Sequence, residues 1–137
     1  MYKNILVPMA LDHDISTNTL EVARALLADG GKIVALHVYD APQGVVTAYL
    51  DEATAAAAYS AAKSRLIEKA THIDGVEAKI IDGHSSRAII EYANKNSVDC
   101  IVIGSHRPDL RDYFLGSTAS RVVRHAKCAV HVYRREN

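Results

Sequence analysis

The chain has 137 residues, of which 49% are hydrophobic and 23% charged, a size and composition typical of one globular domain with a substantial core. Its 16 lysines and arginines balance 16 aspartates and glutamates, so bulk charge gives no reason to expect a nucleic acid or an anionic membrane as partner. No apolar run approaches the roughly 20 residues that span a bilayer, and the first residues lack the layout of a signal peptide. We therefore expect one domain over residues 1–137, with no nucleic-acid binding and no membrane insertion.

Neither the cysteines nor the histidines form a pattern typical of a metal site. Cys100 and Cys128 are the only cysteines, and neither belongs to a CxxC pair, which argues against a zinc site or a disulfide framework and favours the reducing cytoplasm. The seven histidines are scattered, without HExxH or paired spacing. We expect no metal held by protein side chains and a cytoplasmic location.

Short apolar segments alternate with helical patterns along the chain. In chain order, the patterns predict a strand at 4–8, a helix at 16–28, a strand at 32–39, a helix at 52–73, a strand at 77–82, a helix at 85–95, a strand at 100–103, a helix at 117–126 and a strand at 128–133. This alternation predicts an α/β fold, with a doubly wound parallel sheet of five strands and helices on both faces.

Two local features of these elements carry further expectations. The Gly30-Gly31 pair is expected to separate the first helix from the second strand. The alanine run at residues 53–58 favours a helix. We expect that part of the helix to pack closely on the sheet, and the alternative is that it faces a partner protein.

The sheet type indicates where a ligand would bind. In open sheets of this class, ligands lie beyond the carboxyl ends of the strands, at the point where the strand order reverses. Five strands commonly take the order 2-1-3-4-5 or 3-2-1-4-5. The second order would place the crevice between the loops that begin at Pro8 and at Gly104.

The segment from Gly104 to Thr118, which begins GSHRPD and ends LGST, has the chemistry of an anion site. Gly104 allows close approach of the backbone, and Arg107 and Arg111 supply positive charge. Gly116, Ser117 and Thr118 open a helix whose free N–H groups favour phosphate. The alternative is that Ser117 only caps its helix and that the two arginines are solvated. Neither a GxxxxGK[ST] nor a GxGxxG motif is present.

The ILVP run that ends at Pro8, the LHV of the second strand, the loop at Gly83 and the run GSHRPD…YFLGSTASRVVRHAKCAVHV together resemble the universal stress protein family. The last run is most similar to the F/G-type bacterial members. The resemblance covers essentially the whole chain and implies a Rossmann-like fold with strand order 3-2-1-4-5. It also implies a homodimer, and the last strand, at a sheet edge, is the expected pairing element.

The resemblance further implies an ATP site, in which ADP or AMP could replace ATP and Mg²⁺ would be held mainly by phosphates and water. Gly104, Gly116 and Ser117 match a Gly-x-x-Gly…Gly-Ser/Thr pattern, with Arg107 at the second glycine position. Val38 matches the residue whose backbone meets adenine, and Ser85 stands where proline is common. The implied site residues are Pro8, Met9, Ala10, Val38, Gly83, Gly104, Ser105, His106, Arg107, Gly116, Ser117 and Thr118.

These features predict an ATP-binding stress-response or signalling protein rather than an enzyme. His106 has no nucleophile and carboxylate that the sequence pairs with it, so we interpret it as a polar contact. One alternative is a nucleotide-independent dimeric adaptor, which Ala10 supports because many members carry aspartate there. The other is a weak ATP hydrolase or a protein that phosphorylates itself. The protein that would read the bound state is unknown.

Overall fold

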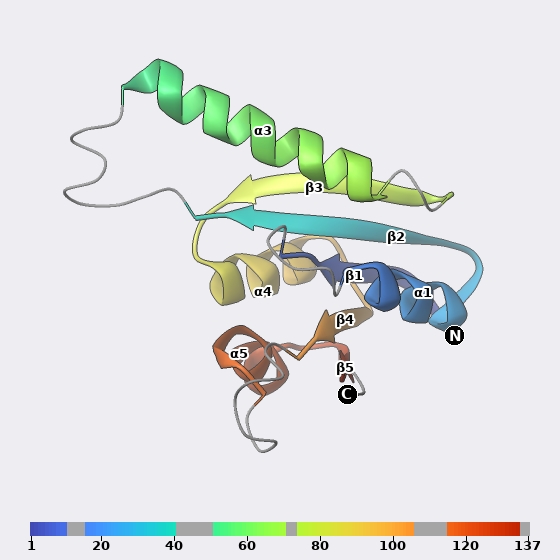
Figure 1. Ribbon diagram of the computed structural model, residues 1–137. Helices are drawn as coiled ribbons and strands as arrows, with labels where there is room; N and C mark the ends of the chain where they lie inside the picture. Colours follow the sequence, from blue (N-terminus) through green and yellow to red (C-terminus); the bar gives the residue numbers. More distant parts are fainter. Residues whose placement is uncertain (11–15, 41–50, 71–73, 106–114, 135–137) are drawn as a thin grey trace.

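The computed structural model describes residues 1–10, 16–40, 51–70, 74–105 and 115–134 (Figure 1). Its elements in chain order are β1 (Tyr2–Pro8), α1 (Ser16–Leu26), β2 (Leu27–Tyr39), α3 (Glu52–Ala70), β3 (Val76–Asp82), α4 (Ser85–Lys95), β4 (Cys100–Gly104), α5 (Ser117–His125) and β5 (Ala129–Tyr133). The predicted alternation of strands and helices is confirmed.

The five strands form one parallel sheet in the order β3-β2-β1-β4-β5. This is the 3-2-1-4-5 order, and it excludes the 2-1-3-4-5 alternative. β1 lies in the centre, where Ile5, Leu6 and Val7 are fully buried in succession. Such a continuous apolar run is what a strand covered on both faces requires.

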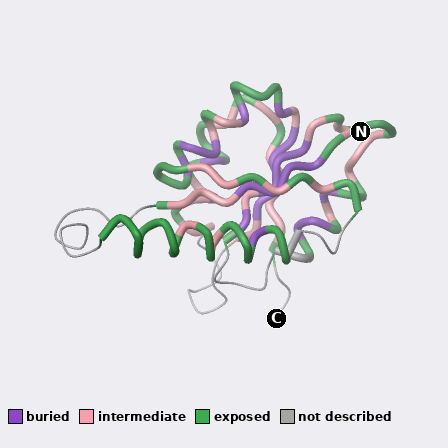
Figure 2. The backbone as a smooth tube through the Cα atoms, turned by 90° about the horizontal axis from the view of Figure 1, so that it is seen from above, coloured by how far each residue is buried: buried purple, intermediate pink, exposed green. Residues whose placement is uncertain are grey.

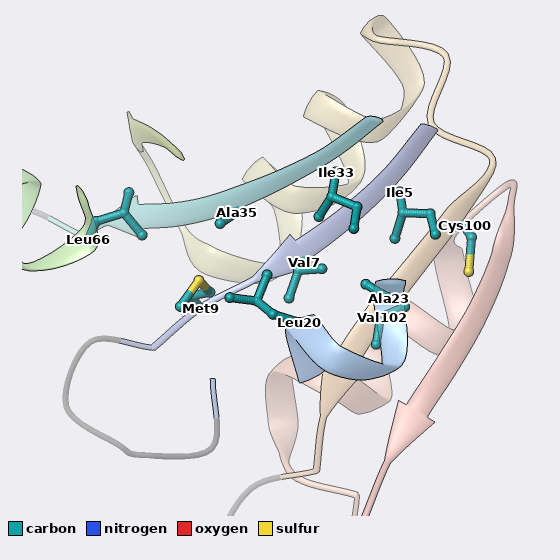
Figure 3. Packing of buried hydrophobic residues seen from close by; sticks show 10 residues of the cluster. All are labelled: Ile5, Val7, Met9, Leu20, Ala23, Ile33, Ala35, Leu66, Cys100 and Val102. Carbon is teal, nitrogen blue, oxygen red and sulfur yellow. The ribbon is translucent and has the colours of Figure 1, made fainter. Parts of the chain in front are cut away.

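Helices cover both faces of the sheet, as the sequence predicts. Successive strand residues point to opposite faces, so Ile5 and Val7 join a core cluster with Leu20 of α1 and Leu66 of α3 (Figure 3). The second cluster fills the other face and contains Leu6, Val34, Leu36, Ile89, Ala93, Val98, Ile101, Ile103, Ala119 and Val122, contributed in part by α4 and α5. In Figure 2 the buried residues follow the strands through the middle of the molecule. Among the described residues, no helix is both long and apolar enough to cross a membrane.

The Gly30-Gly31 pair lies inside β2 rather than before it, so the predicted break there is wrong. The register of β1 against β2 shifts between Tyr2↔Leu27 and Asn4↔Lys32, which is a bulge. A Cβ on Gly31 would lie 2.7 Å from the Leu27 side chain and 3.0 Å from the Lys3 carbonyl oxygen. The glycine pair therefore lets the strand continue past a close approach of backbone, a role that glycine has in strand interiors.

The alanine run of α3 does not pack on the sheet, contrary to the expectation from its composition. Every residue from Glu52 to Ala58 is exposed, and Figure 2 shows this end of the helix in green. The helix is attached through its later turns, where Leu66 is 1% exposed and Ala62 packs against the same core cluster. Helix propensity predicted the helix but carried no information on which residues it buries.

Candidate functional site

The carboxyl ends of the parallel strands meet at one edge of the sheet, and there β1 and β4 separate. These two strands pair only at Ile5↔Cys100 and Leu6↔Ile101. Each nevertheless continues beside its other neighbour, β1 as far as Pro8↔Leu36 and β4 as far as Gly104↔Tyr133. The sheet therefore opens at the point where its strand order reverses, which is the expected place for a ligand in this class of fold.

Both helices on one face of the sheet, α4 and α5, begin at this edge. Their N-cap residues are His84 and Gly116, and neither N-cap makes a side-chain hydrogen bond within the described residues. Gly116 has φ +77°, a conformation that favours glycine. Ser117 is the first residue of α5 rather than its cap, so the capping alternative for Ser117 is wrong. First-turn N–H groups without a side-chain acceptor, together with the positive end of the helix dipole, suit an anion.

A side-chain contact joins the two helix starts. Ser85, the first residue of α4, places its Oγ 3.3 Å from the Oγ1 of Thr118, the second residue of α5. The two residues are 33 positions apart in sequence, and either hydroxyl can be the donor. The predicted phosphate-side residues Gly116, Ser117 and Thr118 thus lie beside the start of α4, a neighbour that the sequence did not indicate.

The other end of the predicted phosphate segment is fixed by the end of β5. The backbone N–H of Ser105 donates to the carbonyl oxygen of Tyr133 at 2.8 Å, and Gly104 pairs with Tyr133 in the ladder. The Tyr133 hydroxyl accepts a hydrogen bond from Asn18 Nδ2 at 3.2 Å, which brings the start of α1 to the same edge. His106 and Arg107 lie outside the described residues.

The three residues predicted from the end of β1 have different surroundings. Pro8 pairs with Leu36, and the Met9 N–H donates to the Leu36 carbonyl oxygen at 2.8 Å. The Met9 side chain is 4% exposed and packs near Leu20 (Figure 3). The Met9 carbonyl oxygen lies 2.9 Å from Nδ1 of His37, which must carry a proton to donate there. Ala10 is exposed. Met9 therefore fixes the path of the backbone, and Ala10 is the residue of the three that faces solvent.

The backbone of Val38 lies just beyond the point where β2 stops pairing with β1. Leu36 directs its carbonyl toward β1, where Met9 binds it, and Tyr39 directs its carbonyl toward the β3 side, where the Gly83 N–H donates at 3.2 Å. Consecutive strand residues alternate the side to which their backbone groups point, so the N–H and carbonyl of Val38 point toward the β1 side. Pairing with β1 ends at Leu36. In the described part of the chain, Val38 has no ladder partner on that side.

Gly83 links the ends of β2 and β3 to the start of α4. Its φ is +143°, and a Cβ added there would lie 3.3 Å from the Cβ of Ala88. The position therefore requires glycine both for its conformation and for its distance to α4. Beside it, Nδ1 of His84 lies 3.7 Å from an Asp40 carboxylate oxygen, with both side chains more than half exposed, so this contact contributes little stability.

The structure thus brings the described site residues to one edge, with Val38 and Gly83 at the β2 and β3 ends and Gly104, Ser105, Gly116, Ser117 and Thr118 at the β4 and α5 side. Sequence reasoning missed Ser85, His37 and Asn18 as supporting residues. Ser85 carried a signal, since it opens a helix next to the predicted Gly83 contact. The other two contacts join segments far apart in sequence. No group of three or more His, Cys, Asp or Glu side chains within the described residues could hold a metal ion.

Comparison with known proteins agrees with this architecture. The model of the universal stress protein family matches residues 1–134. Universal stress protein G from Escherichia coli O157:H7 is 29% identical over 145 residues, covering 98% of this chain and all of that protein. The solved structure of the hypothetical protein MJ0577 has a TM-score of 0.82 at 24% identity, covering 100% of this chain and 99% of the other.

Two other solved structures with this fold hold nucleotides. One is a universal stress protein in complex with cAMP, with a TM-score of 0.71 at 18% identity, covering 97% of each chain. The other is the universal stress protein from Archaeoglobus fulgidus in complex with dAMP, with a TM-score of 0.61 at 20% identity, covering 96% of this chain and 97% of that one. The family match over residues 1–134, the shared fold and the strand order agree, and the chain belongs to the universal stress protein family.

Proposed function

We propose that this protein binds an adenine nucleotide, ATP in the first place, at the carboxyl edge of its sheet and acts as a dimeric stress-response or signalling module. The observation that carries the proposal is the meeting of the α4 and α5 starts at Ser85 and Thr118, at the edge where β1 and β4 separate. The cAMP and dAMP complexes of proteins with the same fold support the choice of an adenine nucleotide.

On the phosphate side, the first-turn N–H groups of α5 and the hydroxyls of Ser117 and Thr118 would donate to phosphate oxygens. Phosphate favours such a site because of the free N–H groups and the helix dipole. Gly116 enters the helix with a positive φ of +77°, a conformation that glycine adopts readily. The family resemblance assigns His106 and Arg107, which lie outside the described residues, to the same side of the site.

On the adenine side, the Val38 backbone would pair with the edge of the base. That edge presents an amino donor and ring nitrogen acceptors, which complement a backbone carbonyl and N–H on one strand residue. The backbone of Met9 is held by its hydrogen bonds to Leu36 and His37, so the chain beside this edge of β2 has a fixed path. If Mg²⁺ accompanies ATP, it would be held by phosphates and water.

The proposal is for binding, and any ATP hydrolysis or self-phosphorylation would be slow and incidental. The bound nucleotide would change the relative populations of two states of the protein, and a partner would read the favoured state. A turnover rate faster than nucleotide release would instead favour the hydrolase alternative. Release of labelled phosphate and of labelled nucleotide, measured on the same sample, distinguishes the two.

Ser117→Asp tests the site directly. The carboxylate would repel phosphate, yet it stands in the first turn of α5, where a negative charge stabilises a helix. We expect the variant to lose at least tenfold in ATP affinity by calorimetric titration, with an unchanged or higher melting temperature. Ser64→Asp on the exposed side of α3 is the matched control. Equal ATP affinity in wild type and Ser117→Asp would contradict the proposed phosphate site.

Nucleotide carried through purification, identified by mass spectrometry, shows whether the cell supplies ATP, ADP or AMP.

The dimer and the cytoplasmic location are part of the same proposal. β5 is an edge strand, and its Ala129 and His131 are exposed, so antiparallel pairing of two such strands would cover both edges. His131→Lys would place like charges near the two-fold axis and weaken pairing. Light scattering at micromolar concentration should give a dimer for wild type and a smaller mass for the variant. A wild-type monomer would favour a single-chain nucleotide sensor.

The proposed cytoplasmic location has one supporting observation. Both cysteines are free, which suits a reducing compartment.

A further inference from the structure

The hydrogen bond between Ser85 and Thr118 has a preferred direction if Thr118 contacts phosphate. Each hydroxyl has one proton to donate and two lone pairs that accept. Phosphate oxygens are acceptors, so Thr118 is useful to a phosphate only if its proton is free for that contact. This requires Ser85 to be the donor and Thr118 Oγ1 the acceptor in the 3.3 Å contact.

We propose that Ser85 is a positioning residue of the nucleotide site, which donates to Thr118 Oγ1 and thereby directs the Thr118 proton to the phosphate. This inference rests on the proposed nucleotide binding at this edge. A hydroxyl that accepts one hydrogen bond also becomes a stronger donor of another, so the relay strengthens the Thr118 contact as well as orienting it. Ser85 itself need not touch the ligand.

The surroundings of the pair fit this role. Ser85 is exposed and Thr118 is half-buried, so removal of the Ser85 hydroxyl leaves no buried group without a partner. The two side chains come from helices that also pack together through their buried faces, with Ile89 and Ala93 of α4 and Ala119 and Val122 of α5 in one core cluster. The backbones that carry the hydroxyls are therefore held by the core, independently of the contact between them.

Calorimetric titration of the full chain with ATP and with adenosine tests the proposal. Ser85→Ala should weaken ATP binding about two- to tenfold, the range expected for one hydrogen bond, and leave adenosine binding unchanged, because adenosine has no phosphate. Ser85→Thr keeps the hydroxyl and should retain wild-type affinity. Ser120→Ala removes a hydroxyl from the same part of α5 that takes no part in this contact and should also behave as wild type.

A double-mutant cycle identifies the route through Thr118. In a Thr118→Val background, Ser85→Ala should have no further effect on ATP affinity, since its acceptor is gone. An undiminished effect in that background would overturn the proposal, as would equal losses for ATP and adenosine or unchanged ATP binding in Ser85→Ala. If the wild-type protein binds neither ligand, the proposed function itself fails. Wild-type binding with an inert Ser85→Ala contradicts only the role of Ser85.

Discussion

Asn4 and Asp99 exchange hydrogen bonds at the amino ends of β1 and β4. The Asn4 N–H donates to Asp99 Oδ1 at 3.0 Å, and the Asp99 N–H donates to the Asn4 carbonyl oxygen at 3.0 Å. The Asp99 carboxylate also accepts from the Lys3 N–H at 2.9 Å. These two central strands are therefore tied at one end of the sheet and separate at the other, where the nucleotide is proposed to bind. The hydrogen bonds of Asp99 that stabilise this strand pair and the candidate site therefore lie at opposite ends of β1 and β4.

Asp99→Ala should destabilise the protein because it removes the carboxylate from two backbone N–H groups. We expect a loss of about 1–2 kcal/mol in the free energy of unfolding, a typical range for hydrogen bonds to a charged acceptor in a partly exposed position. Asp99→Asn keeps one acceptor oxygen and should lose less. Asp29→Ala at an exposed position is the control. Urea unfolding measures all three, and an Asp99→Ala variant as stable as the control would refute the role of this contact.

Gly83→Ala should cost more stability than Gly75→Ala. Both glycines have positive φ, but a Cβ on Gly75 meets no atom within 4 Å, whereas one on Gly83 lies 3.3 Å from Ala88 Cβ. Gly75→Ala should therefore cost about 1 kcal/mol from backbone conformation alone, and Gly83→Ala about 2–3 kcal/mol. Thermal and urea unfolding of the pair separate the two effects. Similar losses would show that α4 shifts freely at this point.

Leu66→Ala should loosen α3, because Leu66 is 1% exposed and anchors the helix in the core cluster. Truncation of a buried leucine costs about 2–5 kcal/mol. The neighbouring Ile67, which is 44% exposed, is the control, and Ile67→Ala should cost under about 1 kcal/mol. Hydrogen exchange of the α3 amides should rise in Leu66→Ala before that of β1. Equal stability of the two variants would mean that the core does not hold α3 through Leu66.

Cys100 should make the stability depend on pH in the alkaline range. Burial, and secondarily the nearby Cys128 and Asp99, raises the pKa of the Cys100 thiol to about 11, whereas an unfolded cysteine titrates near 8.5. Between these values the folded state holds the proton and the unfolded state releases it. The free energy of unfolding should therefore fall as pH rises through this window, by at most about 1.4 kcal/mol per pH unit for this group.

Comparison with Cys100→Ala isolates the contribution of the thiol, because other groups also titrate at alkaline pH. The alanine variant should be less stable than wild type at pH 7, and the difference should shrink toward pH 11. A constant difference would mean that the thiol pKa is the same in both states. Both cysteines are free, Cys100 in the cluster on the α1 and α3 face and Cys128 against the cluster on the α4 and α5 face.

Local patterns determined which segments form strands and helices. The run of Ile5, Leu6 and Val7 lies in the strand predicted at 4–8 and is fully buried, and the helix predicted at 85–95 is α4, which buries Ala88, Ile89 and Ala93. These signals depend on neighbouring residues and can be read from the chain itself. The segment from Gly104 to Thr118 was likewise assigned to an anion site by its residue types, and its two ends lie at the carboxyl edge of the sheet.

Residue patterns did not decide the relations between distant segments. Periodicity left two strand orders open, because a strand's hydrophobic pattern is the same whichever strands lie beside it. The family resemblance implied the 3-2-1-4-5 order, and the structure confirms it. The predictions for the glycine pair in β2 and for the alanine run of α3 were wrong for a related reason. Whether a strand continues through the glycines, and whether the alanines are buried, depends on which other segments approach them in space. Contacts such as Asn4 with Asp99, His37 with Met9 and Ser85 with Thr118 join residues that no local pattern connects. The sequence alone therefore determined the elements and the chemistry of the segment, whereas the packing of the chain decided which backbone and hydroxyl groups face the proposed nucleotide.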